Sequence, residues 1–556
     1  MVNYPQDYYM MNIFSVKTLR TTGRRQNVLK YYILVLVGAG LVYGVTCAPG
    51  ALWQDSGMIQ YRVWHNDIEG KLGLALSHPL FYIPAIGAKY ILPGEFGFRV
   101  NMLTAVTSAF AVANVFLLLR IWTKRNLPGL IAALSLGLSH TFWRHGAIAE
   151  TYNLYIALLM GELIVLLQYC RTQKIGWLYG LALLNGLAIA NHMLGVFGLA
   201  CYGIFVVGLV IKKKVRLKHI TVICLLWLLA AAPFIYLIVR NISQTGDIGG
   251  TAASALFGTA YQQEVLNTHI TGRIVKENIL FFLMNFPTPN ILLAVVGLYL
   301  LPQIAPKGKY AAVIIALLIM FFIFAFRYTI VDRYAFFIPF YAIIAILIGL
   351  GSYVVLEGRR NKVVMWVILL CTLLPIGAYA IGPGLARKMK LTVGTKREIP
   401  YRDDYQWFLQ PWRRGYNGAE QFADEALAGV EDNAVIYADN TTVYPLLYAQ
   451  EVHNKGKTVT VISGIVSSKN ALQGIKHLSG IQKGGTRNIS VIEKGYPPQK
   501  GGAQIFNKQN IDSLLTEGSV YVVTPMKGYC PEFLLENYDF KKEGVLYKVV
   551  PGRSRE

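Results

Sequence analysis

Long apolar runs alternate with short polar segments over the first two thirds of the chain. Single runs of membrane-span length cover residues 31–48, 100–121, 221–239, 278–301, 311–326, 334–356 and 363–381. Two longer stretches, 127–170 and 176–211, contain polar interruptions, and each exceeds the roughly 20 residues that one span requires. We therefore expect two helical hairpins there. The pattern predicts an α-helical polytopic membrane protein with about 11 transmembrane helices.

The pattern changes after residue 382, where charged residues occur throughout and short alternating runs replace the long apolar ones. Residues 434–438, 458–462 and 519–524 have the β-branched alternation of strands, and 419–427 and 443–452 have the spacing of amphipathic helices. This segment is long enough to bury its own core. It is predicted to form a separate α/β domain.

Basic clusters between the apolar runs give the expected orientation, because positive residues favour the cytosolic side. They predict a cytosolic segment at residues 1–30, a transmembrane domain at 31–382 with a first outer loop at 49–97, and an exoplasmic domain at 383–556. The net charge of +23 follows from these clusters. It therefore gives little support to nucleic-acid binding. The six cysteines, most of them in apolar segments, suggest neither a disulfide framework nor a metal site.

Acidic and imidazole side chains gather in the segments predicted to face outward. The first outer loop contains Asp55, Ser56, Asp67, Glu69 and His78, and the polar interruption of the first hairpin brings Arg144, His145, Glu150 and neighbouring Tyr152 to the same side. An isolated Asp in such a loop is usually a helix N-cap. Several acids and imidazoles together indicate an acid/base site.

Arg327 and Arg333 lie at a predicted outer boundary, against the prevailing bias of positive charge. Either can be an interfacial anchor whose charge reaches the lipid headgroups. The alternative is recognition of a phosphate at the membrane face, for which the guanidinium fork is well suited. The polar segment 240–277 is also long for a simple connection, which favours a lid or a binding loop.

Three segments together resemble C-type (GT-C) membrane glycosyltransferases: WQDSG at 53–57, SHPL at 77–80 and AIAETYNLYI at 147–156. They are most similar to the family of transmembrane O-mannosyltransferases that modify plexin-type domains, and to its bacterial relatives. YADNTTVYPLLYAQEV at 437–452 resembles a stretch of the bacterial members. Met58 stands where the family usually has Glu, the turn at His78 lacks a second Pro and a Gly, and an acid is missing at 440–442.

The resemblance implies an inverting glycosyltransferase that moves a sugar, mannose being the one it suggests, from a polyprenyl-phosphate donor to a Ser/Thr hydroxyl of a protein on the outer membrane face. It implies Asp55 as the general base and Glu150 and His78 as further catalytic residues. Donor-phosphate binding falls to Arg333, Arg327 and Arg144. The residues expected to position acceptor or sugar are Ser56, Asp67, Glu69, His145 and Tyr152.

The same residues are compatible with other acceptors and with another function. The acceptor can be a glycolipid or polysaccharide, and a flippase or transporter of a lipid-linked substrate competes with the enzyme. Transporters often show internal repeats and charges at the membrane midplane, neither of which is convincing in this chain. No cofactor is required, although some GT-C enzymes use a divalent cation. The expected location is a bacterial inner membrane, with the endoplasmic reticulum as the alternative.

Overall fold

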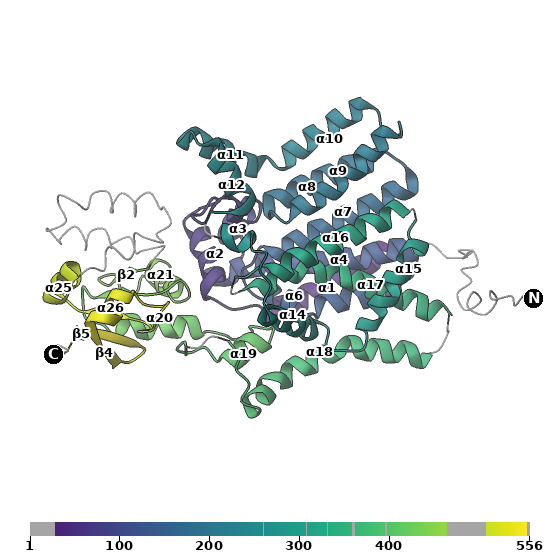
Figure 1. The fold of residues 1–556 in the computed structure, drawn as a ribbon. Helices are drawn as coiled ribbons and strands as arrows, with labels where there is room; N and C mark the ends of the chain where they lie inside the picture. The colour runs from purple at the N-terminus through teal and green to yellow at the C-terminus, as the bar shows by residue number, and fades with distance from the viewer. Residues whose placement is uncertain are drawn as a thin grey trace, which may run out of the picture.

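The structure is a computed structural model that describes residues 28–259, 261–306, 308–330, 332–358, 362–394, 397–463 and 508–552. A bundle of helices occupies one side of the molecule, and a small domain of helices and strands sits at one end of the bundle (Figure 1). We call this end the domain end. Most of the predicted cytosolic segment, residues 1–27, lies outside the described residues.

Six described helices are long and apolar enough to cross a membrane, and a bent pair makes up to seven. The six spans lie in α1 (Val28–Thr46), α4 (Phe96–Thr123), α7 (Tyr152–Thr172), α16 (Gly308–Arg327), α17 (Ile338–Gly358) with the preceding η2 (Arg333–Phe337), and α18 (Lys362–Lys388). Each coincides with an apolar run of the sequence. The polytopic membrane character is therefore confirmed, while the count of about 11 stays a prediction.

The two predicted hairpins both break where polar residues interrupt the apolar pattern. The first consists of α5 (Asn126–Gly137), the short α6 (His140–Gly146) and α7, and the second of α8 (Gly176–Asn191) and α9 (Gly195–Ile211). In the second, the chain turns at His192, directly after α8 ends at Asn191. Both breaks leave polar side chains near the domain end.

Two expectations about the middle of the chain are wrong. Residues 278–301 do not form one span, because α14 (Gly272–Asn285) ends before Pro287 and Pro289 and α15 (Ile291–Ile304) begins after them. Residues 240–277 are not an irregular loop. They include the end of α11 (Ala232–Thr245), α12 (Ile248–Phe257), α13 (Gln262–Val265) and the start of α14. The preceding α10 (Leu217–Ala230) meets α11 at 73°.

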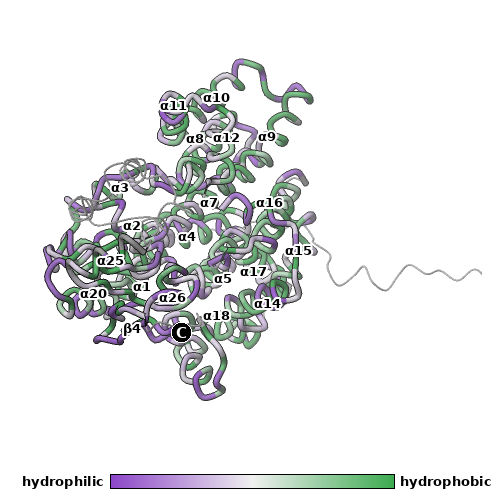
Figure 2. The backbone as a smooth tube through the Cα atoms, turned by 60° about the vertical axis from the view of Figure 1, so that its left-hand side comes forward, coloured by the Kyte–Doolittle hydropathy of each residue, from purple (hydrophilic) through white to green (hydrophobic). Residues whose placement is uncertain are grey.

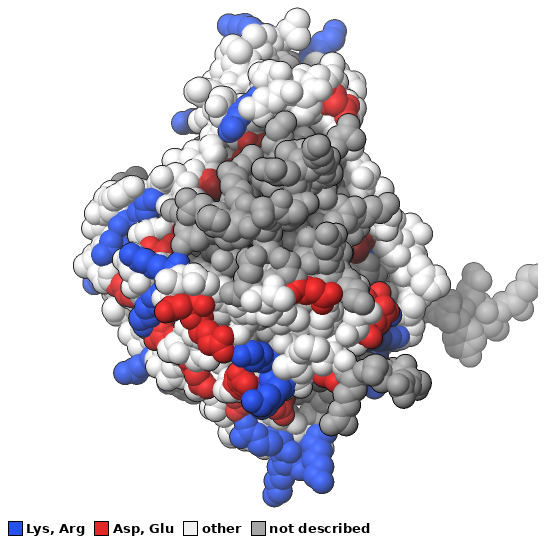
Figure 3. Space-filling model, turned by 90° about the vertical axis from the view of Figure 1, so that its left-hand side faces the viewer, with Lys and Arg blue, Asp and Glu red and all other residues white. Residues whose placement is uncertain are grey.

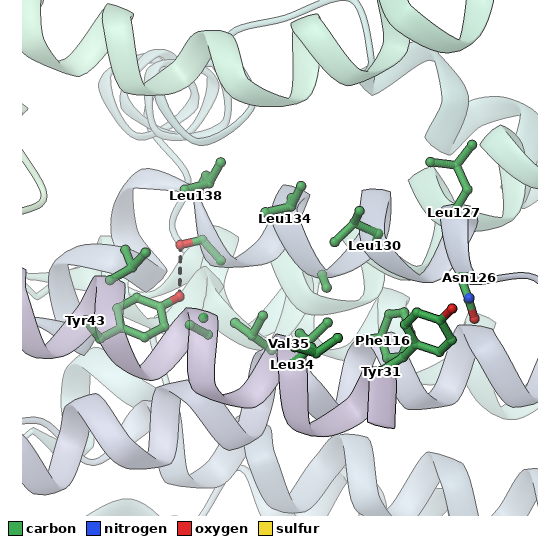
Figure 4. A pocket seen from close by; sticks show the side chains of 16 residues that line it. Tyr31, Leu34, Val35, Tyr43, Phe116, Asn126, Leu127, Leu130, Leu134 and Leu138 are labelled. Atoms are coloured by element: carbon green, nitrogen blue, oxygen red, sulfur yellow. Dashed lines mark hydrogen bonds between the residues drawn. The ribbon is translucent and has the colours of Figure 1, made fainter. Parts of the chain in front are cut away.

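The bundle is built around α17, whose apolar window is wholly buried and which packs against α15, α5 and α16. Hydrophobic residues dominate the bundle helices, whereas the domain mixes hydrophobic and hydrophilic ones (Figure 2). An apolar groove of about 530 Å³ runs between α1, α4 and α5. Leucines and valines make up half of its lining residues, and the Tyr43 hydroxyl at one end donates to the Gly137 carbonyl at 2.9 Å (Figure 4).

The C-terminal domain contains a five-stranded sheet in the order β2-β1-β3-β5-β4. The strands are β1 (Val435–Tyr437), β2 (Thr460–Ile462), β3 (Val520–Val522), β4 (Tyr538–Glu543) and β5 (Leu546–Pro551). The first three are parallel and coincide with the predicted strands; β4 and β5 form an antiparallel hairpin that the sequence pattern did not predict. The helices in the described residues of the domain are α19 (Asp404–Leu409), α20 (Gly418–Ala428), α21 (Val443–Glu451), α25 (Lys508–Glu517) and α26 (Glu532–Asn537).

The domain and the bundle share one hydrophobic core. Residues of α2 (Gln54–Trp64), α3 (Pro79–Ile91) and the start of α4 pack in the same cluster as α20, α21 and the sheet. Polar contacts support this junction: the Ala51 amide donates to Glu420 at 3.0 Å, and His65 contacts Glu451 at 2.6 Å. The exposed face of this end carries acidic and basic side chains side by side (Figure 3). The domain is thus firmly attached to the first loop of the bundle.

Candidate active site

A cavity of about 230 Å³ lies at the domain end, directly beneath this junction. Its walls come from widely separated parts of the chain: α2, residues 72–82 up to the start of α3, residues 150–152 at the start of α7, Tyr261, residues 328–336 around the start of η2, and residues 440–444 at the start of α21. We call it the acid cavity, because three carboxyl groups line it: Asp55, Glu150 and Asp332. No continuous stretch of sequence contains all three.

Asp55 and Asp332 form a hydrogen-bonded carboxyl pair. Burial, the charge of Asp332 and the hydrogen bond between them raise the pKa of Asp55 well above its ordinary value. Burial also raises the pKa of Asp332, although the hydrogen bond from Asp55 opposes the rise. Two carboxylates this close cannot both ionise easily, so the pair holds one proton and one negative charge between its two members.

Glu150 is the third acid of the cavity. Burial and the nearby charge of Asp332 raise the pKa of Glu150 to about 8, while the charge of Arg144 opposes the rise. Its backbone amide donates to the Thr104 hydroxyl at 3.1 Å, which fixes the segment before α7 against α4. At neutral pH Glu150 is therefore mostly protonated and can donate a hydrogen bond to an oxygen in the cavity.

His78 lies opposite, at the N-cap of α3, in a left-handed backbone conformation with φ of 53°. Its Nδ1 contacts the Asn191 carbonyl at 2.7 Å, and its ring packs on His192 at 4.8 Å. Since a carbonyl only accepts, Nδ1 carries the proton and Nε2 is left as an acceptor. Burial lowers the pKa of His78 to about 4, so the ring is neutral at physiological pH.

Arg62 is the cationic side chain that lines the acid cavity within the described part of the chain. It is 6% exposed, donates to the Ser77 carbonyl at 3.0 Å, and lies over the Tyr82 ring at 3.8 Å. Because these contacts leave donor capacity on its five N–H groups, Arg62 can also bind an anion in the cavity.

The C-terminal domain supplies one wall of the acid cavity through Asn440, Thr441 and Tyr444. The Thr441 carbonyl accepts a hydrogen bond from the Gln54 amide at 3.2 Å, next to Asp55. Asp439 fixes this turn, since its carboxylate accepts from the Thr441 amide at 2.8 Å and from both terminal nitrogens of Arg397 at 2.6 and 2.7 Å. Part of the stretch 437–452, which resembles the bacterial members of the family, therefore lines the acid cavity.

The structure divides the predicted catalytic and positioning residues into three groups. Asp55, Glu150, His78 and Tyr152 line the acid cavity. Asp67 and Glu69 line a second, neighbouring cavity. Ser56 and His145 line neither: Ser56 is buried in α2, and His145 is buried in α6 with Nδ1 2.7 Å from the Thr141 carbonyl.

The predicted phosphate-binding arginines are likewise dispersed. Arg333 binds Glu277 at 2.7 Å and Asn278 at 2.8 Å, which ties the start of η2 to α14. Arg327 donates to the Asn267 carbonyl at 2.8 Å, which ties the end of α16 to the segment after α13. Arg144 donates to the Trp407 carbonyl at 2.9 Å and lies close enough to the acids to lower the pKa of Glu150. None of the three lines the acid cavity.

Sequence reasoning missed Asp332 and Arg62. Arg62 follows Asp55 by seven residues, which places both on one face of a helix, and this spacing is visible in the sequence. Asp332 lies within FRYTIVDRYAFF, beside the two arginines that drew attention to that stretch. Its pairing with Asp55 depends on tertiary structure and has no local signal.

The described residues contain no group of three His, Cys, Asp or Glu side chains arranged to hold a metal ion. Asp55 and Asp332 instead share a proton, and Glu150 is kept mostly neutral.

Comparison with known proteins shows similarity to membrane glycosyltransferases. Residues 75–217 match the family model described as the N-terminal domain of protein O-mannosyl-transferase TMEM260. ArnT from Cupriavidus metallidurans bound to undecaprenyl phosphate has a similar structure, with a TM-score of 0.55, 13% identity, and 94% of this chain and 98% of ArnT covered. This chain has a GT-C fold. Its resemblance to the transmembrane O-mannosyltransferases is confirmed over the matched residues, and with it the prediction of a glycosyltransferase.

The same ArnT in the apo state gives a TM-score of 0.54 at 12% identity, over 94% of this chain and 98% of ArnT. No curated protein sequence significantly matches the chain. At these identities the structural likeness shows the fold of the GT-C glycosyltransferase. This likeness does not identify the substrates of this chain.

Proposed function

We propose that this glycosyltransferase moves a single sugar, mannose in the first instance, from a polyprenyl-phosphate donor to a Ser or Thr hydroxyl of a protein. The observation that supports this most directly is the Asp55–Asp332 pair in a small cavity that is also lined by one guanidinium, that of Arg62. A base and an anion-binding group that face the same sugar-sized space are what such a transfer requires.

The acid pair acts as the general base. The acceptor oxygen attacks the anomeric carbon as the bond from that carbon to the phosphate oxygen breaks. The hydroxyl proton passes to the pair, which then holds two protons, and the polyprenyl phosphate leaves with the bonding electrons. One displacement of this kind inverts the anomeric centre. Asp55 keeps the role predicted for it, now shared with Asp332.

The leaving phosphate binds Arg62. A guanidinium stabilises the charge that develops on the phosphate oxygens, and it does so more strongly in a cavity from which water is excluded. Arg144 adds positive potential from behind the acids. The phosphate role predicted for Arg327 and Arg333 is thereby moved to Arg62, because those two arginines are engaged in structural contacts away from the cavity. The undecaprenyl phosphate bound to ArnT supports a lipid donor of this type.

The sugar lies between the acids and the wall formed by the C-terminal domain. At about 230 Å³ the cavity is smaller than the roughly 300–1,000 Å³ typical of drug-sized ligands, which suits one monosaccharide rather than a glycan chain. Protonated Glu150, neutral His78 and the carboxamide of Asn440 offer both donors and acceptors to sugar hydroxyls. Tyr152 forms an apolar side of the same space.

The test is a transfer assay with the purified full-length chain, radiolabelled polyprenyl-phosphate mannose and Ser/Thr peptides. Transfer by the wild-type chain and its loss in Asp55→Asn would support the proposal; equal transfer by Asp55→Asn would refute the role of the pair. A divalent cation is tested in the same assay, where we expect EDTA to leave transfer unchanged.

We propose a bacterial inner membrane location with the domain end outside. The basic clusters support this orientation. A reporter fused after residue 360 should be cytosolic, and one fused after residue 556 should be exoplasmic. A cytosolic reporter at residue 556 would contradict the orientation.

A further inference from the structure

A second cavity, of about 970 Å³, lies beside the acid cavity at the domain end. One side is the first loop of the bundle, residues 66–74, and the other is formed by the end of α11, α12 and Thr259. We call it the polar cavity. Part of it comes from segment 240–277, whose length and polarity already predicted a binding role.

The segment of residues 71–73 borders both cavities. Leu72 lines the acid cavity, while its neighbours Lys71 and Gly73 line the polar cavity. The segment is fixed by the Leu72 carbonyl, which accepts from the Thr259 amide at 3.1 Å, and by the Leu74 amide, which donates to the Ser254 hydroxyl at 3.0 Å. A chain bound in the polar cavity would thus lie directly beside the transferred sugar.

An ion pair also connects the two cavities. Asp67, in the polar cavity, lies 3.7 Å from the Nε of Arg62, the cation of the acid cavity. The same Asp67 carboxylate accepts from the amides of Glu69 and Gly70 at 3.0 and 2.8 Å, which holds the loop in its bend. The loop therefore positions Arg62 and lines the polar cavity at once.

The polar cavity is lined by amides, hydroxyls, carboxylates and two cations together with the apolar side chains of Ile68 and Leu74, and none of its lining residues is aromatic. Glu69 and Arg240 pair at 3.4 Å across it. Among the described residues, Gln244 and Lys71 have no side-chain hydrogen bond or ion pair, and both are exposed. The cavity thus offers unpaired donors and acceptors to a polar ligand.

We infer that the polar cavity is the acceptor subsite and that it takes an extended polypeptide segment; this rests on the proposed transfer to protein hydroxyls. An extended main chain presents an N–H and a C=O at every residue, and each needs a partner when water is displaced. Amide and carboxylate side chains supply such partners. A lipid acceptor would find only two apolar side chains, Ile68 and Leu74, among the lining residues, and a glycan would find no aromatic face for its sugar rings.

Cross-linking provides the direct test, with full-length chains carrying Gln244→Cys or Ser243→Cys. Ser243 is the matched control, because it is exposed on α11 next to Gln244 and does not line the cavity. A Ser-containing peptide with a bromoacetyl group near the Ser should alkylate the Gln244→Cys chain at least tenfold faster than the Ser243→Cys chain. The unmodified peptide should suppress this difference. Equal rates would overturn the inference.

An activity test separates this inference from the proposed function. Gln244→Trp narrows the cavity, and we expect the ratio of peptide transfer to donor hydrolysis by water to fall at least tenfold, while Ser243→Trp keeps the wild-type ratio. A wild-type ratio in Gln244→Trp would overturn the subsite. Impaired use of a short oligosaccharide acceptor, with peptide use unaffected, would overturn its assignment to polypeptides. A wild-type chain that neither hydrolyses nor transfers the donor would refute the proposed function itself.

Discussion

The carboxyl groups of Asp55 and Asp332 share a hydrogen bond, although one lies in the first turn of α2 and the other directly precedes η2. The pair joins the first loop of the bundle to the start of its central helix. Each carboxyl changes the proton affinity of its partner, so the two titrate as a unit. A base made in this way has a higher proton affinity than an ordinary aspartate and still carries a negative charge.

Asp332→Asn should abolish transfer almost as completely as Asp55→Asn. The amide cannot take up the proton of the acceptor, and general-base catalysis typically contributes about 10²–10⁴-fold. We expect kcat to fall by at least about 100-fold in either variant, measured with labelled donor and peptide at pH 7.

Asp424→Asn is the matched control, because Asp424 forms an exposed ion pair with Lys455 at 2.6 Å far from either cavity. It should retain wild-type activity. If Asp332→Asn also retained it, Asp55 would be the base without a partner, as the sequence alone suggested.

Much of the bundle could be predicted because apolar runs of span length have few alternatives in a membrane. The runs at 100–121 and 334–356 correspond to α4 and to α17 with η2. The prediction of one span at 278–301 is wrong, because two prolines interrupt the helix although the run is apolar. The site was harder, because Asp55 and Glu150 are marked by local motifs whereas Asp332 becomes a partner only after α17 packs into the bundle.

The raised pKa of Glu150 predicts that kcat/KM depends on pH on the alkaline side of neutrality. Below its pKa of about 8, Glu150 is neutral; above it, a second negative charge appears beside the donor phosphate. The KM for the donor should therefore rise, and kcat/KM should fall, as pH increases through about 8. In Glu150→Gln the side chain stays neutral and this fall should disappear. The same alkaline fall in both proteins would show that another group causes it.

Arg62 and Arg333 should respond differently to substitution. Arg62→Lys keeps the charge and loses the fork, so the KM for the donor should rise about tenfold or more, since a hydrogen bond to a charged group contributes about 1.5–3 kcal/mol. Arg333→Ala should lower the melting temperature, because Arg333 is buried against Glu277 and Asn278. Its KM for the donor should change little once the protein is folded. A larger KM effect in Arg333→Ala than in Arg62→Lys would restore the original assignment.

The turn at residue 440 links the C-terminal domain to catalysis. Asn440→Ala removes a carboxamide from the cavity wall but leaves the Asp439–Arg397 pair intact. We expect an increased KM for the donor and an unchanged melting temperature. Arg397→Met should lower both activity and melting temperature, because it leaves Asp439 buried without its cation. If Asn440→Ala had wild-type kinetics, the domain would support the cavity without contacting the substrate.

A substitution at Gly73 tests whether the chain segment between the two cavities controls access of the acceptor to the sugar. The backbone of Gly73 has φ of 106° and ψ of 157°, a region that side chains other than glycine rarely adopt, and an added Cβ would lie 2.3 Å from the Thr259 amide nitrogen. Gly73→Ala should therefore break the Leu72–Thr259 hydrogen bond and reduce peptide transfer relative to donor hydrolysis. Gly246→Ala is the control, since Gly246 has φ of 68° and no atom within 4 Å of an added Cβ. It carries only the backbone cost, about 1–2 kcal/mol, and should keep the wild-type ratio of transfer to hydrolysis. Equal ratios in the two variants would show that the wall does not control access of the acceptor to the sugar.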